Sequence, residues 1–144
     1  LVTIIVGIAT VVAINTFGSA ADSANVDSVR QDLATIAASA QGFYMKPTML
    51  GGGGRTFEGI TFDNLAFPGT ITNNGLTASN ENGVYTIPAV GANAQTFLVT
   101  AIPASEADDA TEIKIAVCPN NAQMGILDGP DPDCAPAGEG EGEG

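Results

Sequence analysis

The sequence predicts an α+β fold: one long N-terminal helix that packs through its C-terminal half on a small antiparallel β-sheet. Three observations predict it. Residues 1–21 form an uncharged apolar run, and apolar residues then recur three and four positions apart up to residue 43, a helical period. Between Arg55 and Val117 the period shifts toward two, with turn residues between short segments. Two cysteines near the C-terminus predict a disulfide-closed loop. At 144 residues the chain can build one small domain beyond the helix.

Residues 1–21 contain no Asp, Glu, Lys, Arg, His or Pro. As an α-helix of about 1.5 Å per residue, this run is roughly 31 Å long, close to the hydrocarbon thickness of a bilayer. An isolated helix satisfies its own backbone hydrogen bonds in that setting. The small residues Gly7, Ala9, Ala13 and Gly18 permit close helix–helix approach. We therefore expect a hydrophobic, membrane-competent helix over residues 1–21.

Residues 22–46 predict an amphipathic continuation of the same helix. Pro47 disfavours helical geometry at the residue before it, so the helix is expected to end near Tyr44 or Met45. The weak helix formers between Asn15 and Ser19 allow a local interruption there. The predicted core-facing stripe consists of Val26, Val29, Leu33, Ile36, Ala40 and Phe43.

Residues 47–137 are expected to form the globular head domain. Four glycines, Gly51–Gly54, follow the helix and predict a flexible turn into the sheet, since a phosphate-binding loop would need a preceding strand and a following helix. Short segments without intervening helices favour an antiparallel sheet. The segments with strand character are 56–62, 69–72, 84–87, 96–102 and 111–117.

Cys118 and Cys134 lie in turn-rich sequence, and an even cysteine count favours a disulfide. Closing such a loop would stabilise the fold by roughly 3 kcal/mol. Zinc is disfavoured because the chain has no His and no further Cys. Asp128, Asp131 and Asp133 offer oxygens for Ca²⁺, but their spacing differs from an EF-hand loop, so exposed turn carboxylates are the default interpretation. Alternating Gly and Glu at 138–144 predict a solvated, disordered tail.

Charge and composition exclude several classes of function. Sixteen acidic residues against four basic ones give a net charge of −12, which repels nucleic acid. Without His, the common general base and the usual triads are absent, and the acidic residues cluster in turns. We therefore expect no catalytic residues, no enzymatic activity and no cofactor.

An apolar helix that begins Leu1-Val2-Thr3-Ile4-Ile5-Val6, an amphipathic continuation, a small sheet and a C-terminal cysteine pair together resemble the type IV pilin superfamily. The sequence-specific part of the likeness covers roughly the first 45 residues. The family usually carries Glu as the fifth mature residue and a helix-breaking Pro near the twenty-second. At the position of that Glu this sequence has Thr3 or Ile5, depending on the alignment, and Gly18-Ser19 is the nearest substitute for the Pro.

The resemblance implies a structural subunit of an extracellular pilus-like filament at the cell surface. Such a subunit is processed by a prepilin peptidase, held in the inner membrane, and extracted by the pilus assembly machinery into a helical homopolymer. Alternatives are a pseudopilin of a secretion system and a membrane-anchored binding module that never polymerises. The residues expected to form subunit contacts in the filament core are Ile4, Ile5, Ile8, Val11, Val12, Ile14 and Phe17.

Overall fold

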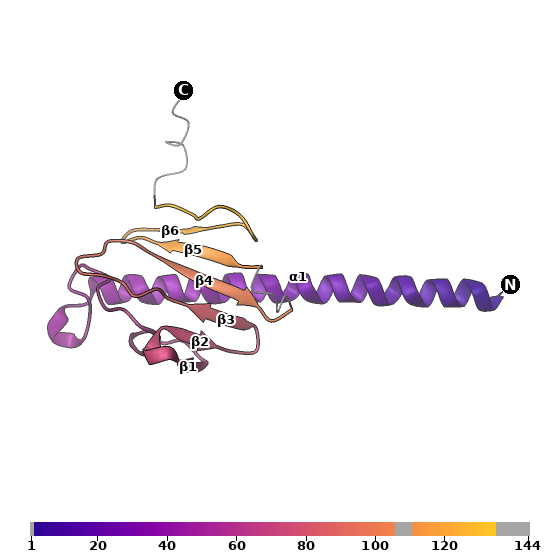
Figure 1. Cartoon of the computed structure of the whole chain (residues 1–144), viewed down its shortest axis with the longest axis horizontal. Coiled ribbons are helices and arrows are strands. Elements are labelled where there is room, and N and C mark those ends of the chain that lie inside the picture. Colours follow the sequence, from indigo (N-terminus) through magenta and orange to yellow (C-terminus); the bar gives the residue numbers. More distant parts are fainter. Residues whose placement is uncertain (1, 106–110, 135–144) are drawn as a thin grey trace, which may run out of the picture.

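The computed structural model describes residues 2–105 and 111–134, and at residues 9–19 it describes the backbone alone. A single α-helix, α1 (Val2–Met45), runs through 44 residues without interruption and projects well beyond the rest of the chain (Figure 1). At about 1.5 Å per residue it is roughly 66 Å long. The weak helix formers around Gly18 do not break it, because their propensity costs are small beside the many helical hydrogen bonds on either side. The expected tail at 138–144 lies outside the described residues.

The head contains one six-stranded antiparallel sheet in which every strand pairs with its neighbour in sequence. The two central pairings are the longest. Between β3 and β4, Gly83 lies opposite Pro103 and Thr86 opposite Thr100. Between β4 and β5, Phe97 lies opposite Val117 and Ala101 opposite Ile113. The strands are β1 (Thr70–Thr72), β2 (Thr77–Ser79), β3 (Gly83–Thr86), β4 (Phe97–Pro103), β5 (Ile113–Val117) and β6 (Ala122–Met124).

The expected strand at 56–62 is wrong. Gly59 has a positive φ of 67°, and the backbone N–H groups of Phe57 and Gly59 donate to the loop carbonyls of Ala94 and Val90 rather than to a strand. The segment is an irregular loop followed by a short 3-10 helix, η2 (Phe62–Asn64). Its apolar residues Phe57, Ile60 and Phe62 are nevertheless buried, so their apolar character indicated burial correctly although the segment is not a strand.

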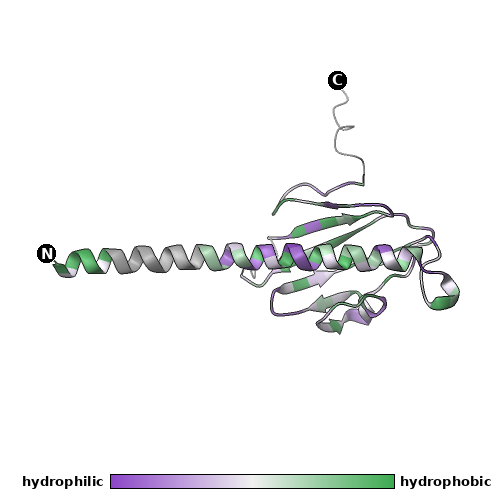
Figure 2. Cartoon of the chain, turned by 180° about the vertical axis from the view of Figure 1, so that it is seen from behind, coloured by the Kyte–Doolittle hydropathy of each residue, from purple (hydrophilic) through white to green (hydrophobic). Residues whose placement is uncertain are grey.

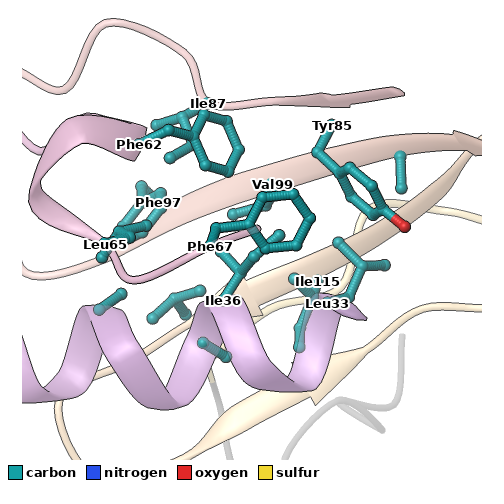
Figure 3. Packing of buried hydrophobic residues seen from close by; sticks show 14 of the residues in the cluster. Leu33, Ile36, Phe62, Leu65, Phe67, Tyr85, Ile87, Phe97, Val99 and Ile115 are labelled. Atoms are coloured by element: carbon teal, nitrogen blue, oxygen red, sulfur yellow. The ribbon is translucent and has the colours of Figure 1, made fainter. Parts of the chain in front are cut away.

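The core lies between α1, the sheet and the loop that runs from Phe57 to Phe67 (Figure 3). Phe57 contacts Phe97 edge-on, and Phe67 contacts Tyr85 in the same way, with ring centroids 5.0 Å apart in both pairs. Along β4, residues 97, 99, 101 and 103 are buried and the residues between them are partly exposed, as expected for a strand with one face on a core. The sheet therefore presents one face to the helix.

The stripe predicted on α1 faces this core. Val29, Leu33, Ile36, Ala40 and Phe43 are buried, and Val26 is half-buried at the edge of the cluster. Spacings of three and four residues place these side chains on one side of a helix. The second half of α1 is thus an integral part of the head.

The four glycines after the helix form a hydrogen-bonded cap. The N–H groups of Gly53, Gly54 and Arg55 donate to the carbonyls of Phe43, Lys46 and Tyr44 at 2.8, 3.0 and 2.8 Å. Carbonyls at the end of a helix have few intrahelical donors, and these bonds supply additional ones. A Cβ on Gly53 would lie 1.9 Å from the Thr56 carbonyl oxygen, so only glycine fits there. This segment was expected to be a flexible turn, but its backbone hydrogen bonds fix it against the helix.

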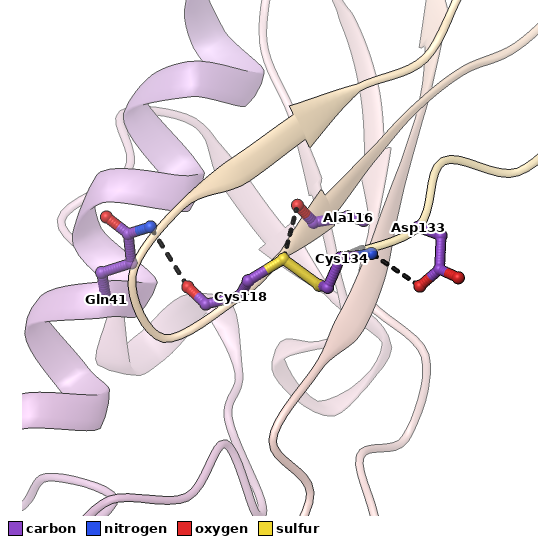
Figure 4. The surroundings of a disulfide bond; sticks show 5 residues. All are labelled: Gln41, Ala116, Cys118, Asp133 and Cys134. Carbon is purple, nitrogen blue, oxygen red and sulfur yellow. Dashed lines mark hydrogen bonds between the residues drawn. A yellow bond between two sulfur atoms is a disulfide. The ribbon is translucent and has the colours of Figure 1, made fainter. Parts of the chain in front are cut away.

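The disulfide predicted between Cys118 and Cys134 is present, with a Cα–Cα distance of 5.8 Å (Figure 4). It ties the end of β5 to the last described segment of the chain. The Gln41 amide of α1 donates to the Cys118 carbonyl at 3.1 Å. The disulfide-closed loop is thereby connected to the helix as well as to the sheet.

Candidate functional site

The N-terminal half of α1 carries apolar side chains that the fold of the chain does not bury. We call residues 2–21 the rod. Figure 2 shows its apolar start standing away from the head. The side chains of Val2, Ile4, Ile5 and Ile8 are 62–74% exposed. Surface residues of this kind normally occur singly, whereas here they occupy one continuous segment.

The residues predicted to make subunit contacts all belong to the rod. Ile4, Ile5 and Ile8 are exposed on it and available to a partner. The side chains of Val11, Val12, Ile14 and Phe17 lie outside the described residues, although their backbone is helical. The described part of the prediction therefore consists of exposed branched side chains on a rigid element.

Burial of these side chains is energetically large. A fully buried Val, Leu or Ile side chain contributes about 1.5–3 kcal/mol. Four such residues supply on the order of 10 kcal/mol before the entropic cost of association is subtracted. The head does not use this energy, because its own core is closed by α1 residues from Val26 onward.

A polar cluster joins the head end of α1 to the turn between β2 and β3. One oxygen of Asp32, Oδ2, accepts three hydrogen bonds: from the Tyr85 hydroxyl at 2.6 Å, from the Asn82 amide at 2.8 Å and from the Asn80 amide at 3.0 Å. About two helical turns before Asp32, the Asn25 amide donates to the Asn82 carbonyl at 2.9 Å. The helix is thus anchored to the sheet by hydrogen bonds as well as by apolar packing.

Electrostatics favours the ionised form of this carboxyl. Partial burial raises the pKa of Asp32, but the hydrogen bonds from Asn82, Tyr85 and Asn80 outweigh it and hold the pKa below its ordinary value of 3.8. Burial and the neighbouring carboxylate raise the pKa of the Tyr85 hydroxyl, which therefore stays protonated and donates. The cluster contains an acceptor with three donors and no nucleophile beside a base, so its chemistry is structural.

The sequence pattern does not predict this cluster. The helical period puts Asp32 among the polar positions between the apolar ones of residues 22–46, and Tyr85 falls in the segment 84–87 with strand character. The signal was the run Asn80-Glu-Asn82-Gly83, whose side chains can bond a carboxylate as well as their own turn: Asn80 Oδ1 also accepts from the N–H groups of Asn82 and Gly83. Nothing in the one-dimensional pattern pairs that turn with position 32.

The three aspartates considered for calcium each have a different partner. Asp128 accepts from the Glu112 N–H at 2.9 Å, and Asp133 accepts from the Cys134 N–H at 2.6 Å. Asp131 pairs with the Lys114 ammonium at 2.6 Å, and Glu112 pairs with the same ammonium at 2.7 Å. Hydrogen bonds from Lys114 to Asp131 and Glu112 raise the pKa of that ammonium. Among the described residues, no three His, Cys, Asp or Glu side chains gather as a metal site would require.

Within residues 2–105 and 111–134, no helix meets the length and hydrophobicity needed to cross a bilayer. Comparisons of the chain with models of known protein families, with curated proteins and with solved structures find no match.

Proposed function

We propose that the chain is a structural subunit of an extracellular, type IV pilus-like filament, in which the rods of many copies form the core and the acidic heads face the solvent. One observation carries this proposal: an uncharged rod exposes branched apolar side chains on a helix that continues rigidly into a head with a complete core of its own. A surface of this kind needs a partner, and a second copy of the rod is a chemically matching one.

The head half of α1 offers a surface against which a neighbouring rod can lie. Ala34, Ala38 and Gly42 are exposed along the side of the helix that faces away from the sheet, and a Cβ on Gly42 would meet nothing within 4 Å. Small residues let two helix axes approach closely, since the interaxial distance depends on the side chains at the contact. A rod can therefore pack against other rods and against the outer side of a neighbour's helix.

The proposal also includes an earlier stage in the membrane, before assembly. Residues 1–21 carry no ionisable side chain, so the rod can lie in lipid without burying a charge. Processing by a prepilin peptidase and extraction by the assembly machinery belong to the same proposal. Exchange of lipid for neighbouring rods keeps the same side chains out of water at both stages.

The test is electron microscopy of sheared surface material from cells that express the full chain, and of the variant Ile8→Asp. A carboxylate buried without a partner costs several kcal/mol per subunit, so we expect filaments from the unchanged chain and none from Ile8→Asp. The variant's head should remain folded and disulfide-bonded. Thr86→Asp, an equal charge on the exposed side of β3, is the matched control and should leave filaments intact.

The outcomes separate the alternatives. Vesicle-bound single copies of the unchanged chain, with no fibres, would favour a membrane-anchored binding module. Short assemblies that depend on a secretion machine would favour a pseudopilin. Unchanged fibres after Ile8→Asp would contradict assembly through the rod.

A further inference from the structure

The end of the head farthest from the rod carries exposed apolar side chains. Met45, Met49 and Leu50 are 66%, 95% and 66% exposed, on the last residue of α1 and on the short 3-10 helix η1 (Thr48–Leu50). In Figure 1 this magenta segment lies at the opposite end of the molecule from the N-terminus. We call residues 45–50 together with Arg55 the tip.

The tip is rigidly attached. The loop returns two hydrogen bonds to carbonyls of the last turn of α1 and one to the Lys46 carbonyl just after it, and the Gly52 N–H donates to the Pro47 carbonyl at 3.1 Å. A Cβ on Gly52 would lie 2.3 Å from the Lys46 carbonyl oxygen, so the loop closes tightly over the helix end. Exposed Met and Leu side chains on a fixed backbone form a preorganised contact surface, since little conformational freedom remains to be lost on docking.

The opposite end of the head, next to the rod, has a groove of about 520 Å³ between α1 and the segment after β6. Val26 and Leu127 give it an apolar lining, and neither is fully buried. Along α1, positions 26 and 45 are about 29 Å apart at 1.5 Å per residue. The residues that line the groove are Asp22, Ser23, Val26, Asp27, Arg30 and Leu127.

The charges of the tip and the groove are complementary. Of the four basic residues, Lys46 and Arg55 lie at the tip, both exposed, and neither forms an ion pair among the described residues. Asp22 and Asp27 are exposed at the groove and outnumber its one basic residue, Arg30. In a chain of net charge −12, two unpaired cations beside an apolar surface are well suited to an acidic, partly apolar receptor.

We propose that the tip of one copy docks into the groove of the next copy along the helix axis, an inference that rests on the filament proposed above. Met49 and Leu50 enter the groove toward Val26 and Leu127, and Lys46 and Arg55 approach Asp22 and Asp27. The tip and the groove are different surfaces at opposite ends of the head. Such a contact is heterologous, and repeated along the axis it gives an open helical array rather than a closed ring.

The dimensions of the molecule fit this arrangement. The rod, residues 2–21, is about 30 Å long, and the helix segment between groove and tip has nearly the same length. When the groove of the upper copy rests on the tip of the lower one, the upper rod extends back along the lower head. It then runs beside the exposed Ala34, Ala38 and Gly42 of the lower copy. One translation thus satisfies both the rod and the head contact.

The first test is a cross-link in filaments of the full chain. Among the described residues both cysteines are already paired, so new thiols report only on the designed contact. The double variant Leu50→Cys with Ser23→Cys should give, under mild oxidation, a ladder of covalent multimers on non-reducing electrophoresis. The control Leu50→Cys with Thr86→Cys, which puts the second thiol on exposed β3, should give no ladder.

The second test is a charge exchange that does not depend on new cysteines. Lys46→Glu should raise the subunit concentration required for assembly by roughly twofold to fivefold, the range for an exposed ion pair. Asp27→Lys alone should do the same. The two together should restore assembly, since the pair is rebuilt with opposite polarity.

The results distinguish the two proposals. Two outcomes would overturn the end-to-end contact and leave the proposed filament function standing. One is filaments of normal appearance without a ladder from the Leu50→Cys, Ser23→Cys variant. The other is a double charge variant that assembles no better than the single ones. A ladder of equal strength in the Thr86 control would also overturn the contact, as random collision. Failure of the unchanged chain to polymerise would overturn both.

Discussion

The two halves of α1 are both rich in apolar residues, but these side chains are buried in one half and exposed in the other. In the head half, apolar residues occupy one side of the helix and are buried by the sheet, as for Leu33 and Ile36. In the rod, Ile4 and Ile5 point in different directions around the helix and are equally exposed. An apolar stripe on one side of a helix can be buried within the chain, whereas apolar residues that extend around a helix can be buried only by surroundings on all of its sides.

Truncation of one apolar side chain in each half should give the largest contrast. Leu33→Ala removes a fully buried side chain and is expected to lower the free energy of unfolding of the head by about 2–5 kcal/mol. Ile5→Ala removes an exposed one and should leave it unchanged. Denaturant titration of both variants in detergent is the measurement. An equal loss of stability in Ile5→Ala would show that the rod packs against its own head.

Removal of the disulfide should also affect only the head. Cys118→Ser with Cys134→Ser releases a loop with a sequence separation of 16, and we expect a loss of about 3 kcal/mol. Helicity of the rod in detergent, followed by circular dichroism, should persist after the head unfolds. A rod that melts together with the head would indicate that the two halves form one cooperative unit.

Asp32→Asn should weaken the anchor between α1 and the β2–β3 turn, with a loss of about 1–2 kcal/mol because a half-exposed, charged acceptor is removed from three donors. The pKa of Asp32 is lowered by folding, so its contribution is present above the ordinary pKa of 3.8 and is lost as the pH falls through the lower pKa of the folded state.

Unfolding curves measured between pH 7 and pH 2 check this sign. The difference in stability between the unchanged chain and Asp32→Asn should be constant at neutral pH and should shrink only below about pH 4. A difference that grows on acidification would contradict the assigned hydrogen-bonding.

The smallest contrast concerns two helical glycines. Gly7 in the rod and Gly42 in the head both have open space at the Cβ position. Gly42→Ala should raise the stability of the head by about 0.5–1 kcal/mol, since alanine favours a helix interior. Gly7→Ala should leave head unfolding unchanged. Thermal melts of the two variants in parallel are sufficient, and a stabilised head in Gly7→Ala would show coupling between the halves.

Sequence periodicity predicted the features that depend on local chemistry. The end of α1 followed from Pro47, and the disulfide followed from an even number of cysteines. The longest strands, β4 and β5, were found because their residues are β-branched, aromatic and alternating. These signals come from residues close together in the sequence, so they can be recognised without the tertiary structure.

The remaining features depend on residues far apart in the sequence. The sequence does not predict the strands β2 (Thr77–Ser79) and β6 (Ala122–Met124), because three residues are too few to show an alternating pattern and only Thr77 among them has a high strand preference. Pairing with β3 and β5 defines them. The Asp32 cluster was missed because its donors lie at least 48 positions away. The tip was missed because Met49 and Leu50 have no periodic context that marks them as exposed.

The short outer strands have a consequence for amyloid-like aggregation of the folded head. β1 and β6 expose only three residues each at the margins of the sheet, and β6 lies within the loop that the disulfide closes. Margins this short give an incoming strand few backbone groups to bond, so growth of cross-β fibrils from the folded head is suppressed. A filament assembled through the rods, as proposed, should therefore dissolve in mild detergent, which competes for the apolar side chains, and should not bind amyloid dyes.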